Sequence, residues 1–130
     1  MRKIFHCTLL ILGLLLLLSA CDMLSLSETD KEALDSLRDA GSDLTKAHPF
    51  DFYIYHNNKA DAQLICADLK QDGFQASVRE GAIEGEWLCL ARLSFVPSIE
   101  KLTEVGLLFE EIISKYGGEY DGWETIVISE

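Results

Sequence analysis

The pattern of apolar and polar positions predicts strands and helices in the part of the chain that follows an apolar leader. Residues 50–56 alternate, with Phe50, Phe52 and Ile54 on one side, as in a strand with one buried face. Residues 59–72 then repeat apolar positions every three or four residues. That spacing predicts an amphipathic helix directly after the first strand.

The second half of the chain continues this succession of elements. Residues 74–80 and 86–95 are expected to be strands, and the second is apolar on both faces, as in the centre of a sheet. Ser98 is the predicted N-cap of a helix whose apolar positions recur in steps of three and four as far as Tyr116. Residues 119–129 are expected to form the last strand.

A short helix is expected before the first strand. Thr29 and Glu32 have the spacing of a capping box, with Thr29 as the N-cap, and Gly41 is expected to end this helix. The elements that follow have the order β-α-β-β-α-β, which is the split βαβ arrangement. The sequence therefore predicts an α+β fold, a ferredoxin-like split βαβ sandwich with a short N-terminal helix.

The leader has the features of a bacterial export signal. Arg2 and Lys3 precede an apolar run over residues 4–18, and Leu18-Ser19-Ala20-Cys21 stands at its end. This ending resembles the lipobox of bacterial lipoproteins, in which the cysteine is acylated and the leader is removed. An uncleaved membrane helix is one alternative, although a run of about fifteen residues is shorter than the roughly 20 that span a bilayer. Cleavage at a plain secretory site is the other, and it would leave Cys21 as a free thiol.

Acylation of Cys21 would divide the chain into a lipoprotein signal peptide (residues 1–20), a lipidated tether (21–29) and a domain (30–130). Because the basic start stays in the cytoplasm, the rest of the chain is expected to cross the membrane. Asp22 resembles the signal that keeps enterobacterial lipoproteins in the inner membrane. We therefore expect an inner-membrane protein whose acyl chains, palmitate among them, hold the domain on the periplasmic side.

The charge of the chain narrows the choice of partners. The 130 residues carry 11 basic and 22 acidic side chains, and removal of Arg2 and Lys3 with the leader leaves a net charge of −13. Such a surface repels nucleic acids and anionic headgroups. The sequence therefore predicts no binding of nucleic acid, and contact with the membrane only through the Cys21 lipid anchor.

Two short motifs resemble a known family. A Tyr120-Asp121-Gly122-Trp123 run directly after the last expected helix, and Gly41-Ser42-Asp43 upstream, are similar to the ribonuclease E inhibitor RraB family. The likeness, including the order of elements, covers roughly residues 30 to 127. The resemblance implies a small α+β domain that binds a protein and has no catalytic residues.

The expected function combines the leader and this resemblance: a membrane-anchored lipoprotein with an RraB-like protein-binding or regulatory domain on the periplasmic side. One alternative is a cytoplasm-facing inhibitor of ribonuclease E, as in the cytoplasmic members of that family. Another is a small envelope enzyme of unknown chemistry. A shared fold does not by itself transfer a function.

A surface for the partner is expected on the sheet. The alternation of the strands permits Tyr53, Tyr55 and Trp123 to lie together on the face without helices. Tyr120 and Asp121, which precede Trp123 in the sequence, complete this possible partner surface. Asp121-Gly122 is expected to bend or bulge the chain as it enters the last strand, since glycine tolerates positive φ. The alternative is that Tyr120 and Trp123 only pack onto the sheet.

Candidate chemistry for catalysis or metal binding is sparse. The sequence contains no HExxH or CxxC motif, no nucleophile elbow and no phosphate-binding glycine loop. His48 and His56 flank the first strand without the spacing of a zinc site, and we expect both to be exposed loop residues. No enzyme activity, cofactor or metal is therefore expected.

Cys66 and Cys89 are the cysteines that remain once the leader is removed and Cys21 is acylated. Both are expected to face the same layer of the core, and an oxidising compartment permits a disulfide between them. The usual separation of helix and sheet backbones argues instead for two buried free thiols, because a disulfide needs Cα atoms within about 7 Å. Both alternatives remain open at the level of sequence.

Overall fold

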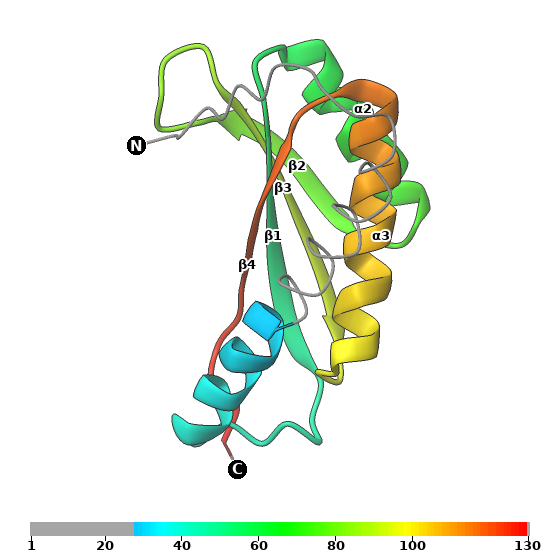
Figure 1. The fold of residues 1–130 in the computed structure, drawn as a ribbon. Helices are drawn as coiled ribbons and strands as arrows, with labels where there is room; N and C mark the ends of the chain where they lie inside the picture. Colours follow the sequence, from blue (N-terminus) through cyan, green and yellow to red (C-terminus); the bar gives the residue numbers. More distant parts are fainter. Residues whose placement is uncertain (1–27, 130) are drawn as a thin grey trace, which may run out of the picture.

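The computed structural model describes residues 28–129 (Figure 1). Residues 28–39 are helical, and a turn and a connector lead from them to the first strand. The remaining elements are β1 (His48–His56), α2 (Lys59–Gln71), β2 (Gln75–Glu80), β3 (Trp87–Phe95), α3 (Ile99–Tyr116) and β4 (Glu119–Glu124).

The four strands form one antiparallel sheet with the order β2-β3-β1-β4. β1 and β2 are joined through α2 and are separated in the sheet by β3, which is the split βαβ connection. The expected ferredoxin-like α+β fold is confirmed.

The helices α2 and α3 cover one face of the sheet, and the core lies between the two layers (Figure 1). The helix over residues 28–39, blue to cyan in Figure 1, lies at one end of the sheet beside the end of β4. The centre of the core consists of fully buried side chains: Phe50, Phe52, Ile54, Ile65, Leu69 and Phe109.

The ends of the two long helices follow the sequence signals. The side chain of Asn58 accepts a hydrogen bond from the Asp61 N–H at 3.1 Å and caps α2. Ser98 does the same for α3, where it accepts from the Lys101 N–H at 3.1 Å. Each cap supplies an acceptor to a backbone N–H that has no partner within the helix.

Three boundaries differ from the expected ones by more than one residue. β1 begins at His48, two residues earlier than predicted, and β4 ends at Glu124 instead of continuing to residue 129. Residues 28–39 are helical, so Thr29 lies inside the helix and is not its N-cap. The capping-box prediction is therefore wrong, since an N-cap residue has non-helical dihedral angles.

Cys66 of α2 and Cys89 of β3 are joined by a disulfide, with a Cα–Cα separation of 5.9 Å. Both side chains are buried. At this point α2 lies closer to the sheet than the general separation of helix and sheet backbones suggests. The disulfide therefore fastens the first long helix directly to an inner strand.

Among the helices of residues 28–129, none combines the length and the apolar character that a bilayer-spanning segment needs.

Candidate protein-binding site

A β-bulge in β4 determines where its aromatic side chains lie. Gly122 pairs with Tyr53 of β1, but Tyr120 pairs with the next residue, Ile54, so Asp121 is the extra residue. Gly122 has a φ of 120°, a backbone conformation that residues other than glycine rarely adopt. The expected bulge at Asp121-Gly122 is therefore present, and it changes which face each neighbouring side chain occupies.

Because of the bulge, Tyr120 and Trp123 both lie on the face of the sheet that carries the helices. Trp123 pairs with Phe52 and packs its ring edge against Phe50 at 5.1 Å between centroids. The Tyr120 ring lies 4.9 Å from that of Phe109 in α3. The expectation that Trp123 shares the helix-free face with Tyr53 is wrong, because simple alternation does not hold across a bulge.

The helix-free face retains Tyr53 and Tyr55 of the expected surface. Tyr53 donates a hydrogen bond to Glu124, and this bond raises the pKa of its hydroxyl to about 12. Beside it, Arg92 binds both carboxylate oxygens of Asp51, at 2.6 and 2.7 Å. Tyr53 and Asp51 thus already have polar partners on this face, and the role of Tyr53 and Tyr55 in binding a partner stays a prediction.

A pocket with a volume of about 340 Å³ lies between the helix over residues 28–39, α3 and β4, and we call it the α3 groove. Its volume is within the range of about 300–1,000 Å³ typical of ligand sites. The side chains along it are mainly apolar, and Leu107 at its edge is 47% exposed. The lining residues are Thr29, Asp30, Ala33, Leu102, Thr103, Gly106, Leu107, Phe109, Glu110, Ile113, Tyr120, Asp121, Gly122 and Trp123.

Asp30 brings a partly buried carboxylate into this groove. The indole Nε1 of Trp123 donates to its Oδ1 at 2.9 Å. Burial raises the pKa of Asp30, and the hydrogen bond from Trp123 offsets only part of this effect. Burial also raises the pKa of Tyr120, and the nearby charge of Asp30 adds to the increase. Three of the five residues expected at a partner surface, Tyr120, Asp121 and Trp123, therefore line the groove instead of the open sheet face.

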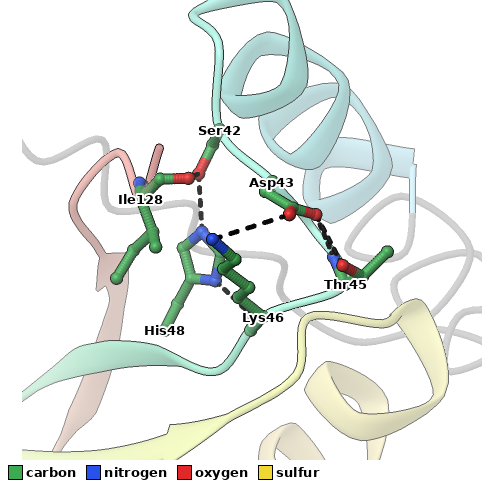
Figure 2. A network of polar contacts seen from close by, with 6 residues as sticks. All are labelled: Ser42, Asp43, Thr45, Lys46, His48 and Ile128. Carbon is green, nitrogen blue, oxygen red and sulfur yellow. Dashed lines mark hydrogen bonds and ion pairs between the residues drawn. The ribbon is translucent and has the colours of Figure 1, made fainter. Parts of the chain in front are cut away.

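The Gly41-Ser42-Asp43 turn, which follows the helix over residues 28–39, has a structural role (Figure 2). Ser42 Oγ lies 2.6 Å from His48 Nε2 and accepts a hydrogen bond from the Ile128 N–H at 2.9 Å. The Asp43 N–H donates to the Ile128 carbonyl at 2.7 Å. The turn therefore holds the segment after β4 against the start of β1.

His48 is fully buried in this network, so the expectation of an exposed loop histidine is wrong. Its Nδ1 lies 2.8 Å from the Lys46 carbonyl, which only accepts hydrogen bonds. In the neutral ring Nδ1 is then the donor and Nε2 accepts from the Ser42 hydroxyl. A serine–histidine pair can serve in nucleophilic catalysis. Here Ser42 is buried and its oxygen accepts a hydrogen bond from Ile128, so the pair fits the structural role described above.

His56 is also held by backbone contacts. Its Nε2 lies 2.9 Å from the Tyr116 carbonyl, and its Nδ1 accepts from the Asn58 N–H at 2.9 Å. It thereby joins the end of β1 to the last turn of α3. His48 and His56 lie at opposite ends of β1, so the structure does not bring them together.

Two of the expected site residues, Cys21 and Asp22, lie outside the described residues. Within residues 28–129, no group of three histidine, cysteine or acidic side chains is placed to hold a metal ion.

Sequence reasoning missed Asp30 and Gly106 as parts of a site. The available signal was Gly106 itself, a glycine within an otherwise strong helical pattern.

Comparison with known proteins shows a family that this chain resembles over most of its described length. The family model RraB, Regulator of ribonuclease activity B, matches residues 27–125, which include every strand and helix described above. No curated protein matches the chain.

Proposed function

Because this chain belongs to the family of regulators of ribonuclease activity B, we propose that it is a lipid-anchored regulatory protein of the inner membrane. Its domain acts on the periplasmic side by binding another protein. The family is one of regulators, which argues against a small envelope enzyme.

The leader and its cysteine support the anchored state. Cys21 follows the lipobox-like Leu18-Ser19-Ala20 sequence, and six residues separate it from Glu28, the first described residue. Even fully extended, six residues reach about 20 Å, so an acylated Cys21 would keep the domain close to the bilayer. Acyl chains on such a cysteine partition into the membrane, about 0.8 kcal/mol for each buried methylene.

The disulfide supports export. Cys66 and Cys89 are buried and bonded to each other, and structural disulfides persist in the periplasm but are rare in the cytoplasm.

Binding of a protein rests on one observation above the others, the α3 groove. It is a largely apolar depression of about 340 Å³, with Leu107 exposed at its edge and a carboxylate inside. Concave apolar surfaces with a few polar groups are typical binding sites. The domain therefore offers a recognition surface in place of a set of catalytic side chains.

A direct test combines labelling with crosslinking. Cells are grown with a labelled fatty acid, and the wild-type chain is expected to carry the label, whereas Cys21→Ala accumulates as an unlabelled precursor. The labelled protein is then crosslinked in intact membranes, and a specific protein partner is expected in the product. A wild-type chain without label contradicts the anchor, and a labelled chain without any partner contradicts the binding role.

A second candidate is a cytoplasm-facing inhibitor of ribonuclease E, and the family match itself favours it. Alkaline phosphatase fused after Glu130 separates the two, because that enzyme is active only outside the cytoplasm. Activity supports the periplasmic proposal. An inactive phosphatase with an active cytoplasmic reporter supports the ribonuclease inhibitor.

A further inference from the structure

Gly106 keeps the α3 groove open. It lies in the middle of the 18-residue helix α3, where glycine weakens a helix relative to alanine. A Cβ atom added at this position would meet nothing within 4 Å, so close packing does not demand a glycine. Its φ is not in the positive region either. The feature of the described structure that gains from the missing side chain is the space inside the groove.

The charges along the groove have one sign. Asp30, Glu110 and Asp121 contribute carboxylates, and none of the described lining residues is basic. Trp123 occupies one oxygen of Asp30, and a carboxylate accepts further hydrogen bonds. The carboxylate lies beside the aromatic rings of Trp123 and Tyr120. A positive charge would be attracted by the carboxylate, which can form a charge-assisted hydrogen bond with it.

This charge pattern decides between the possible occupants. The tether that precedes Glu28 has apolar residues, but its charged residue is Asp22, which the carboxylates of the groove repel. A second copy of the chain is also unfavourable, because each copy carries a net charge of −13 once Arg2 and Lys3 are removed with the leader. A partner with basic residues is complementary to the groove.

We propose that the α3 groove binds a segment of a partner protein that inserts an apolar side chain over Gly106 and pairs an arginine or lysine with Asp30. This inference rests on the proposed protein-binding function and assigns the site and the chemistry of the partner. The apolar side chain replaces water along Leu107 and Ile113, and the basic group reaches Asp30 beside the indole of Trp123.

The experiment places a photoreactive amino acid at single positions of the full chain in living cells. Position 107 lies at the edge of the groove, position 55 lies on the helix-free face, and position 64 is the control. Leu64 on α2 is 47% exposed, as is Leu107, but it does not line the groove. The crosslinked peptide is sequenced by mass spectrometry.

The expected result is a product at position 107 that joins a peptide of another protein, with an arginine or lysine within a few residues of the crosslink. Gly106→Leu fills the groove and should reduce the yield at least about tenfold, the size of effect expected when a buried contact is blocked. Asp30→Asn should reduce the yield, whereas Asp39→Asn, an exposed change in the same helix, should leave it unchanged. Gly106→Leu should also retain the unfolding midpoint, because leucine favours a helix more than glycine does.

Four results would overturn the inference: a crosslink to residues 22–27 of the same chain, a crosslink to a second copy, a yield at position 107 no higher than at position 64, or a yield insensitive to Gly106→Leu. A partner captured at position 55 and not at position 107 would distinguish the proposed protein-binding function from the proposed binding in the groove. The protein-binding function would then stand, and the groove would not be its site.

Discussion

The indole Nε1 of Trp123 donates a hydrogen bond to Oδ1 of Asp30 at 2.9 Å, across 93 positions of the sequence. This contact joins the helix over residues 28–39 to β4 at the bulge. It thereby forms one wall of the α3 groove and positions the Asp30 carboxylate within it.

Asp30 should lower the stability of the free domain near neutral pH. Because its pKa is raised in the folded state, the unfolded chain ionises first as the pH rises above about 4, and folding becomes less favourable. Asp30→Asn cannot ionise and keeps an oxygen that accepts from Trp123. The free energy of unfolding of this variant minus that of the wild type should therefore increase from pH 3 to pH 6.

Urea unfolding at each pH measures this difference, with Asp39→Asn as the exposed control from the same helix. A difference that decreases with rising pH, or an Asp30 carboxyl that titrates below 3.8 by NMR, would contradict the assigned environment.

Two glycine-to-alanine changes should have opposite effects on stability. Neither Gly106 nor Gly122 has an atom within 4 Å of an added Cβ, so the variants differ in backbone conformation alone. Gly106→Ala should stabilise the domain by about 0.5–1 kcal/mol, as in the interior of other helices. Gly122→Ala should destabilise it by about 1–3 kcal/mol, because alanine is strained at a φ of 120°.

Thermal and urea unfolding of both variants provide the comparison. Equal effects of the two changes would mean that the bulge at Gly122 does not hold the conformation described.

The Ser42 network should stabilise the end of the chain. Ser42→Ala removes the acceptor of the Ile128 N–H and the neighbour of His48 Nε2. Unsatisfied buried groups cost about 1–3 kcal/mol, and the Ile128 amide should exchange faster with solvent. Ser114→Ala, an exposed change on α3, is the control. It should change neither the free energy of unfolding nor the exchange rate of the Ile128 amide. An Ile128 exchange rate that Ser42→Ala leaves unchanged would contradict the role of the Ser42 network shown in Figure 2.

The sequence predicted those parts of the fold that depend on local pattern. The alternation of Phe50, Phe52 and Ile54 was sufficient for β1, and the periodicity of α3 and the Ser98 cap were sufficient for that helix. The Asp121-Gly122 pair also indicated the bulge.

The candidate site depends on contacts that no local pattern encodes. The faces of Tyr120 and Trp123 were not predictable, because one extra residue at Asp121 inverts the alternation on one side of it. The groove arises only when the helix over residues 28–39 packs beside β4, through a contact between Asp30 and Trp123. His48 is buried because β1 begins at His48 and continues through Pro49, a residue that ordinarily signals a break.

The disulfide should make a measurable contribution to stability. Cys66 and Cys89 are 23 positions apart, and closing a loop of this length stabilises a domain by about 3 kcal/mol. Reduction of the wild type should lower the free energy of unfolding by about that amount. The double variant Cys66→Ala, Cys89→Ala should not respond to the reductant. A wild type that is equally stable with and without reductant would contradict a structural role of the bond.

The redox state of Cys66 and Cys89 inside cells tests the central claim most directly, since that claim places the domain outside the cytoplasm. Intact cells are quenched with acid and divided into two samples. One sample is alkylated directly and the other after reduction, each with a maleimide of high mass that shifts the chain on a gel. The account predicts that Cys66 and Cys89 resist alkylation until they are reduced, because the oxidising periplasm maintains the disulfide. Two thiols that are alkylated without reduction would contradict it and place the domain in the cytoplasm, where it could act on a ribonuclease.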